Sequence, residues 1–169
     1  MTKLQRALLV VLVSVLPHLF GISSPPIDYH HHRQTQTSTI ARNYHRNGMH
    51  FLQPQVNWAG PDQRHAATAL PVYMYLLGLL WSVFSWGALW GRLLSIMSSA
   101  AAAWLLMHFL EDWIDKRAAL YAALVFTVLP VEVFFGRTIQ VDSFALMYTL
   151  GSFVAFDAYL RVHPKKTGT

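Results

Sequence analysis

Apolar and polar stretches alternate along this chain in a pattern that is typical of helices at membrane depth. One apolar run precedes a single long polar stretch, and four more follow it. A helix rises about 1.5 Å per residue, so about 20 apolar residues cross the hydrocarbon core of a bilayer. We therefore predict an all-α integral membrane protein. The apolar runs are residues 7–22, 69–86, 93–110, 118–135 and 143–160.

The first apolar run follows two basic residues, Lys3 and Arg6. Because basic residues favour the cytoplasmic side, the run is typical either of a membrane anchor with a cytoplasmic N-terminus or of a signal peptide. Residues 4–22 would reach about 28 Å as a helix, which is close to the hydrocarbon thickness. We interpret residues 1–22 as an uncleaved first transmembrane helix.

The polar stretch at residues 23–68 contains four of the eight prolines and six of the nine histidines. Such a composition predicts an extramembrane loop or a small cap. Residues 33–47 contain no helix breaker, and Gly48 follows them. Glycine commonly terminates helices, so we predict a mostly polar helix that ends at Gly48.

The positions of the basic residues decide between two topologies. If residues 69–86 crossed the membrane, Lys116, Arg117 and the basic residues at 161–166 would all lie outside, against the positive-inside tendency. If that run lies along the outer interface, every basic cluster lies inside. Its four tyrosines and tryptophans favour an interfacial helix, although a spanning or re-entrant segment stays an open alternative.

The preferred topology has about four transmembrane helices, with interfacial helices in the first outer loop. It divides the chain into a first span at 1–22, an outer loop at 23–92, three further spans within 93–162 and a cytoplasmic tail at 163–169. The small residues at 100–103 suit close helix packing in lipid.

Composition agrees with this interpretation and excludes several kinds of chemistry. Hydrophobic residues make up 54% of the chain and charged residues only 12%, about half the charged fraction of soluble domains. The net charge is +5, but the basic residues are not clustered, so we expect no nucleic-acid partner. The chain has no cysteine, which excludes disulfides, thiolate metal sites and thiol nucleophiles.

Two carboxylates and two arginines lie at the predicted outer membrane boundary. The preferred topology places Asp28 and Asp142 on the same face, close in sequence to Arg33 and Arg137. A carboxylate can take a proton from an acceptor hydroxyl, and an arginine can neutralise a departing phosphate. Such residues would suit transfer of a sugar from a lipid carrier. The alternative is that these charges only mark helix ends in the headgroup zone.

The remaining ionisable residues are weaker candidates. Consecutive side chains such as His30, His31 and His32 diverge, so we predict no metal site there, although a divalent metal held by one or two of them with Asp28 stays an open alternative. Glu132 and Asp157 lie inside apolar runs but near their ends. We interpret both as packing or boundary residues.

Several short motifs, taken in order, resemble a known family. The chain is similar to the N-terminal part of the polyprenyl-phosphate-sugar-dependent glycosyltransferases of the GT-C type, which include the family 39 protein O-mannosyltransferases and the aminoarabinose transferases of lipid A. The similarity covers nearly the whole chain. The motifs are residues 28–37 (DYHHHRQTQT), 40–43 (IARN), Gly48, 70–73 (LPVY), 90–95 (WGRLLS), 116–120 (KRAAL), Pro130 and 136–142.

The resemblance implies a role for each matching residue. Asp28 corresponds to the catalytic aspartate, Arg33 to the basic residue after it, and Asp142 to the acidic residue of the second outer loop, with Arg33 or Arg137 holding the phosphate of the lipid-linked donor. It implies inverting transfer to an acceptor hydroxyl on the outer face of a bacterial plasma membrane. Members of the family commonly have an acidic residue where this chain has Thr68 and Ala69.

Members of the family also have more spans, so the resemblance implies an N-terminal module whose partners are membrane lipid and the remaining C-terminal part of the enzyme. No cofactor other than the open divalent metal is expected. The alternative function is a non-catalytic membrane interaction protein with a histidine-rich outer loop.

Overall fold

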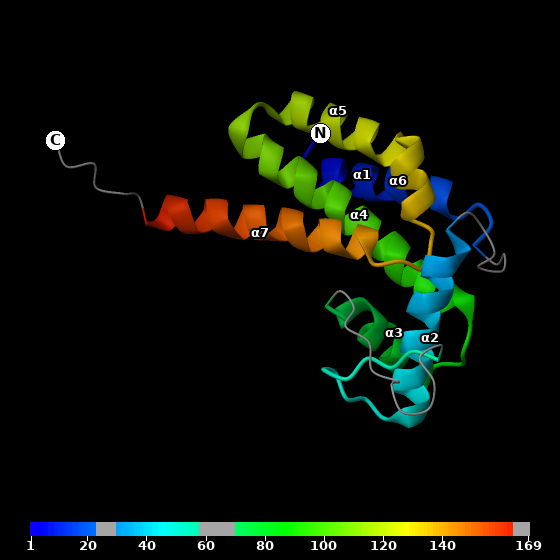
Figure 1. Cartoon of the computed structure of the whole chain (residues 1–169). Helices are drawn as coiled ribbons and strands as arrows, with labels where there is room; N and C mark the ends of the chain where they lie inside the picture. The colour runs from blue at the N-terminus through cyan, green and yellow to red at the C-terminus, as the bar shows by residue number, and fades with distance from the viewer. Residues whose placement is uncertain (23–29, 58–69, 164–169) are drawn as a thin grey trace.

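The computed structural model describes residues 1–22, 30–57 and 70–163, which form an all-α structure (Figure 1). The predicted fold class is confirmed at this level, since no β-strand occurs within those three ranges. The helices are α1 (Lys3–His18), α2 (His31–Asn47), α3 (Val72–Val83), α4 (Ala88–Trp113), α5 (Lys116–Val128), α6 (Pro130–Phe135) and α7 (Asp142–Val162).

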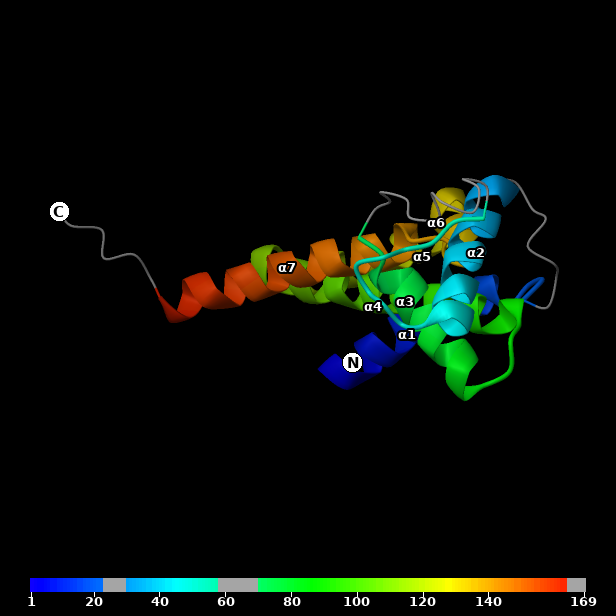
Figure 2. The same ribbon diagram turned by 60° about the horizontal axis from the view of Figure 1, so that its bottom comes forward.

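The central element is α4, which packs against α1, α5 and α7. In Figures 1 and 2, α2 and α3 lie together at one end of this bundle, and α2 crosses the direction of α7. The C-terminal end of α7 projects on the opposite side of the molecule. The polar helix α2 therefore caps one end of the apolar helices.

Small side chains allow α4 to approach its neighbours closely. Ala100, Ala102 and Ala103 are buried on α4, as their position in the sequence predicted. Ala103 belongs to an apolar cluster with Val10 of α1 and Ala119 of α5. Side chains of this size bring helix backbones together and increase dispersion contacts, which is the main source of helix association in lipid.

The helices α4 and α7 run side by side in the same direction. Near the start of α4, a Cβ added to Gly91 would come within 2.8 Å of the Ile139 side chain, just before α7. Near the end of both helices, Arg161 Nη2 lies 3.3 Å from Asp112 Oδ2. Two helices that cross a membrane in the same direction need a third between them in sequence that returns, and α5 with α6 occupies that position.

The cap is held by close contact between α2 and α3. A Cβ added to Gly78 of α3 would lie 3.0 Å from both the Ala41 carbonyl oxygen and the Tyr44 Cβ of α2, so glycine permits this approach. The predicted polar helix is confirmed: α2 ends at Gly48, whose φ of 104° few other residues adopt at low energy.

Two helices differ in extent from the apolar runs of the sequence. The run at 118–135, interpreted as one span, is divided into α5 and α6 at Pro130, because proline has no N–H for the helix ladder and disfavours helical geometry in the residue before it. Helix α4 begins at Ala88, before the apolar run at 93–110, and the predicted outer loop at 23–92 stays a prediction. The interfacial helix of the run at 69–86 extends only over α3.

Two helices, α4 and α7, are long and apolar enough to cross a membrane. Of the other expected spans, α1 has 16 residues and α5 has 13. At about 1.5 Å per residue, they reach about 24 Å and 20 Å, less than the roughly 30 Å hydrocarbon core. The four-span topology stays a prediction.

Candidate functional site

The beginning of α2 lies against the segment that connects α6 to α7. Gln34, which is fully buried, accepts a hydrogen bond at its Oε1 from the backbone N–H of Ile139 at 3.2 Å. One turn earlier, the ring of His30 lies 6.0 Å from that of Phe135. These contacts fix the first turn of α2 beside the first turn of α7.

Hydrogen bonds join α3 and α4 to the connection between α6 and α7. The Tyr73 hydroxyl on α3 donates to the Gly91 carbonyl at 2.8 Å and lies 2.9 Å from the Ser95 hydroxyl. Ser95 in turn donates to the Thr138 carbonyl at 2.6 Å. Burial raises the pKa of the Tyr73 phenol, so it stays protonated and remains a hydrogen-bond donor.

Two of the predicted site residues, Arg33 and Asp142, meet at this place. Arg33 Nη1 lies 3.8 Å from Asp142 Oδ1, and the two side chains are 64% and 40% exposed. An ion pair this long and this exposed contributes little to stability. The other carboxylate oxygen, Asp142 Oδ2, is buried and has no hydrogen-bond partner within residues 1–22, 30–57 and 70–163. Both groups therefore keep hydrogen-bonding capacity for a ligand.

Arg137, the third predicted residue, holds the chain after α1. Its Nη1 donates to the Phe20 carbonyl at 3.1 Å, and its Nε is buried without a hydrogen-bond partner. Arg92 of α4 binds the next residue of the same segment: its Nη1 donates to the Gly21 carbonyl at 3.1 Å. The two guanidiniums bring the end of α1 to the α6–α7 connection.

Sequence reasoning missed Arg92 as a site residue, although its side chain is fully buried. The sequence signal was an arginine at the edge of an apolar run. Burying an arginine without hydrogen-bond acceptors costs free energy, so such a residue is expected to have several acceptors. The carbonyl that it binds lies 71 residues earlier in the chain, so its role could not be read from local spacing.

Two cavities flank Asp142. A cavity of about 230 Å³ lies between α5, α6 and α7, where Asp142, Ser143 and Glu132 join five apolar side chains. Ser143 is buried there, and its hydroxyl has no hydrogen-bond partner. A second cavity of about 360 Å³ lies between α3 and α7 and is mainly apolar, with Tyr73 and Phe144 in its wall. Charged groups thus stand beside apolar cavities.

Glu132 serves packing, as the sequence analysis expected. Its Oε1 accepts a hydrogen bond from the Ser99 hydroxyl of α4, and its carbonyl oxygen lies 3.2 Å from His18 Nε2. A Cβ added to Gly136 would lie 2.0 Å from the same imidazole nitrogen. Glu132 therefore connects α1, α4 and α6. Asp157 pairs with Arg161 one turn later, at 2.7 Å.

Asp28 lies outside the described residues, so its expected pairing with Asp142 stays a prediction. The neighbouring histidines are described from His30 onward, and His31 and His32 are exposed. Their rings were expected to diverge, but the centroids lie 4.6 Å apart. Over the described ranges, no group of three or more histidines and carboxylates could hold a metal ion.

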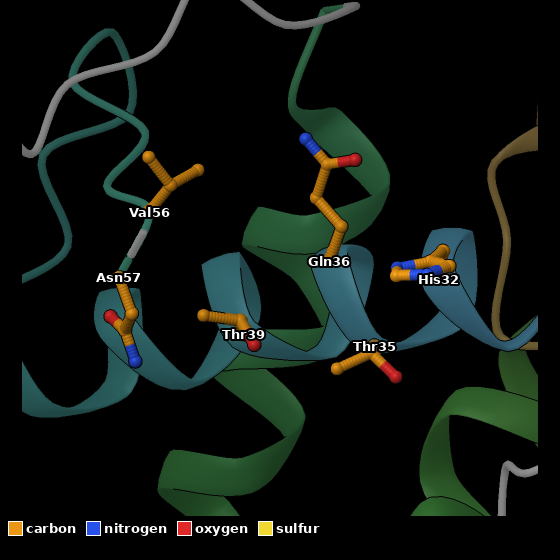
Figure 3. A pocket seen from close by; sticks show the side chains of 6 residues that line it. All are labelled: His32, Thr35, Gln36, Thr39, Val56 and Asn57. Atoms are coloured by element: carbon orange, nitrogen blue, oxygen red, sulfur yellow. The ribbon is translucent and has the colours of Figure 1, made fainter. Parts of the chain in front are cut away.

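A third cavity, of about 350 Å³, lies on the outward face of α2 and was not expected from the sequence (Figure 3). Four of its lining residues come from successive turns of α2, and two from the segment after that helix. We call it the α2 groove; it is lined by His32, Thr35, Gln36, Thr39, Val56 and Asn57.

Comparisons with models of known protein families, with curated proteins and with solved structures find no match to this chain.

Proposed function

We propose that this chain forms part of a membrane glycosyltransferase of the GT-C type, which moves a sugar from a polyprenyl-phosphate carrier to an acceptor hydroxyl. In the proposed reaction, Asp28 takes the proton of the acceptor hydroxyl while its oxygen attacks C1 of the sugar. The bond between C1 and the phosphate oxygen breaks, and polyprenyl phosphate leaves as an anion. Because attack and departure occur on opposite faces of C1, the product has the inverted configuration.

The observation that carries this proposal is the meeting of Arg33 and Asp142 at the start of α7. Their atoms are 109 residues apart in sequence but only 3.8 Å apart in space, and both side chains are open to a ligand. A guanidinium can make two parallel hydrogen bonds to a phosphate. Arg33 would hold the phosphate, while Asp142 would orient Arg33 and the acceptor.

The apolar cavities support a lipid-linked donor over a water-soluble one. The cavity of about 230 Å³ and the one of about 360 Å³ both include residues of the first turn of α7 or the residue before it. A prenyl chain needs such a surface because each buried CH₂ stabilises the complex by about 0.8 kcal/mol. The site thus has a charged part for a phosphate and apolar surfaces for its chain.

A binding experiment with a short prenyl phosphate tests this proposal. The chain, in lipid nanodiscs, is titrated with geranyl phosphate and with geraniol, which lacks the phosphate. Loss of a charge-assisted hydrogen bond is equivalent to about 1.5–3 kcal/mol, so we expect Arg33→Gln to weaken geranyl phosphate binding about 10- to 100-fold. Geraniol binding should not change.

Arg46→Gln is the matched control, because Arg46 is exposed at the other end of α2. It should leave the affinity for geranyl phosphate unchanged. Equal weakening by the two substitutions would mean that the phosphate only senses the overall positive charge of α2, and the proposed site would then be wrong.

A second candidate function is a non-catalytic interaction protein, and the surface of α7 is the observation that favours it. Phe153, Phe156 and Tyr159 are each more than half exposed along this helix, which could pack against a partner helix as well as against lipid. Site-directed crosslinking from Phe156 separates the two functions. A protein partner crosslinked there, together with no binding of geranyl phosphate, would favour the interaction protein.

A further inference from the structure

The α2 groove differs from the Arg33–Asp142 site in its chemistry. Among the described residues, its lining contains two threonine hydroxyls, two carboxamides, one imidazole and one valine, and no carboxylate, lysine or arginine. Its volume of about 350 Å³ falls in the range of roughly 300–1,000 Å³ that is usual for small-molecule sites. A charged ligand would find no counter-ion among these side chains, whereas a neutral polar ligand would find several donors and acceptors.

The two threonines of the groove differ from other threonines of this chain in their hydrogen bonding. Threonines in helices often donate to a backbone carbonyl three or four residues earlier, as Thr127 and Thr149 do in this chain. Thr35 and Thr39 form no hydrogen bond through their side chains within the described residues. They lie one turn apart on α2, so the two hydroxyls face the same groove.

The opposite wall of the groove is held rigidly against α2. Asn43 Nδ2 donates both to the Gln55 carbonyl and to Asn57 Oδ1, each at 2.8 Å. Asn47 Nδ2 donates to Gln55 Oε1 at 2.7 Å. Because the Asn57 oxygen is already engaged, its NH₂ group is the part that remains for a ligand, as a donor.

An apolar floor completes the groove. Val56 lines the groove but is only 1% exposed, so it closes the groove from below and leaves little surface of its own for a ligand. Sugar rings carry C–H groups on their faces and hydroxyls around their edge. The described side chains of the α2 groove offer neutral donors and acceptors to the hydroxyls, and they offer no full positive charge to a phosphate or carboxylate.

We propose that the α2 groove binds a neutral sugar ring, with Thr35, Thr39 and Asn57 making hydrogen bonds to its hydroxyls. The role of the groove in transfer rests on the proposed function, but sugar binding itself does not. Thr35 lies two residues beyond Arg33 on the same helix, so a sugar in the groove would belong either to the donor or to an acceptor glycan.

Binding of simple glycosides tests the proposal. The full chain in nanodiscs is studied by saturation-transfer NMR with methyl mannoside, methyl glucoside and methyl arabinoside, and with inorganic phosphate as a charged probe. We expect at least one glycoside to bind at millimolar concentration and phosphate not to compete with it. If none of the three glycosides binds, the proposal is wrong.

Isosteric substitutions locate the binding site. Thr35→Val with Thr39→Val removes both hydroxyls at nearly constant volume, so we expect at least about tenfold weaker glycoside binding. Thr35→Ser with Thr39→Ser keeps the hydroxyls and should retain binding. Thr149→Val, on α7, is the control and should have no effect. Equal affinity in the double valine variant and the parent would overturn the proposal, provided that circular dichroism shows both folded.

Two further arms separate the possible outcomes. A polyprenyl-phosphate-linked sugar should displace the glycoside if the groove holds the donor sugar, and should leave it bound if the groove holds an acceptor glycan; sugar-free polyprenyl phosphate is the control. Geranyl phosphate binding that depends on Arg33 is measured on the same valine variant. If geranyl phosphate still binds to the valine variant but no glycoside binds to the parent, only the groove proposal is contradicted. If glycosides bind to the parent but geranyl phosphate does not bind, only the proposed function is contradicted.

Discussion

Arginine–carboxylate pairs lie at both ends of the helical bundle, and two of them, Arg6–Glu111 and Arg33–Asp142, differ in burial and in length. At one end, Arg6 of α1 contacts Glu111 of α4 at 2.8 Å, with the side chains 10% and 6% exposed. At the other end, Arg33 and Asp142 are 3.8 Å apart, with the side chains 64% and 40% exposed. The first pair uses its hydrogen-bonding capacity within the protein, whereas the second retains it.

This difference separates a structural pair from a ligand site. Arg6 donates from Nε and Nη2 to the same Glu111 oxygen and from Nη1 to the Met1 carbonyl. Few of its donors remain for another partner. Among the described residues, Arg33 has only its long contact with Asp142, and the second oxygen of Asp142 has no hydrogen-bond partner there. Both pairs consist of a guanidinium and a carboxylate. The pair whose guanidinium has unused hydrogen-bond donors is therefore the one that can bind an anion.

The first prediction concerns the sides of the membrane on which the two ends lie. From Gly91 to Glu111, α4 rises about 30 Å, which matches the hydrocarbon thickness. We expect Asn47→Cys, near the Arg33 end, to react almost completely with an impermeant thiol reagent added outside intact cells. Lys116→Cys, near the Arg6 end, should react only after lysis. The chain has no native cysteine that could confuse the labelling.

Labelling of both positions from outside would contradict the orientation and would place the proposed site and the structural pair on the same side. Expression of each variant is checked with the same reagent after lysis, when both cysteines should react.

The second prediction concerns stability at the Arg6 end. Arg6→Gln leaves the buried Glu111 carboxylate without a cation, which for buried pairs costs about 3–5 kcal/mol. We expect the free energy of unfolding in detergent micelles to fall by that amount, measured by circular dichroism. Lys3→Gln, an exposed position on the same helix, should change it by less than about 0.5 kcal/mol. Equal decreases in the free energy of unfolding for Arg6→Gln and Lys3→Gln would mean that only the total charge of α1 matters, and that the Arg6–Glu111 contact adds no stability.

The third and smallest effect is expected at the Arg33 end. Exposed pairs contribute about 0–1 kcal/mol, so Arg33→Gln should leave the free energy of unfolding nearly unchanged while it weakens geranyl phosphate binding. A loss of stability as large as that of Arg6→Gln would show that Arg33 is structural, and the contrast between the two ends would disappear.

The extent to which sequence predicted this structure depends on the range of the interactions. The end of α2 at Gly48 and the start of α7 at Asp142 follow from local signals, and both were expected. The division of residues 118–135 into α5 and α6 follows from Pro130, which is also a local signal. Whether this run spans the membrane stays a prediction.

The site was only partly predictable, because its contacts join residues that are far apart in sequence. Arg33, Arg137 and Asp142 were expected from their charge at predicted membrane boundaries, and the structure brings Arg33 to Asp142. The role of Arg137 in holding the Phe20 carbonyl depends on a contact across 117 residues. The α2 groove depends on the way residues 55–57 fold back on α2, which no periodicity in the sequence indicates.

The most direct test of the central claim is sugar transfer from a polyprenyl-phosphate-linked sugar, measured for the parent protein and for Asp28→Asn in the membranes of its host. Asparagine keeps the size of the side chain but cannot take the proton from the acceptor hydroxyl. General-base assistance contributes about 10²–10⁴ in rate, so transfer should fall by that factor while donor binding and folding remain intact. An Asp28→Asn protein that folds, binds the donor and transfers sugar at the parent rate would contradict the account.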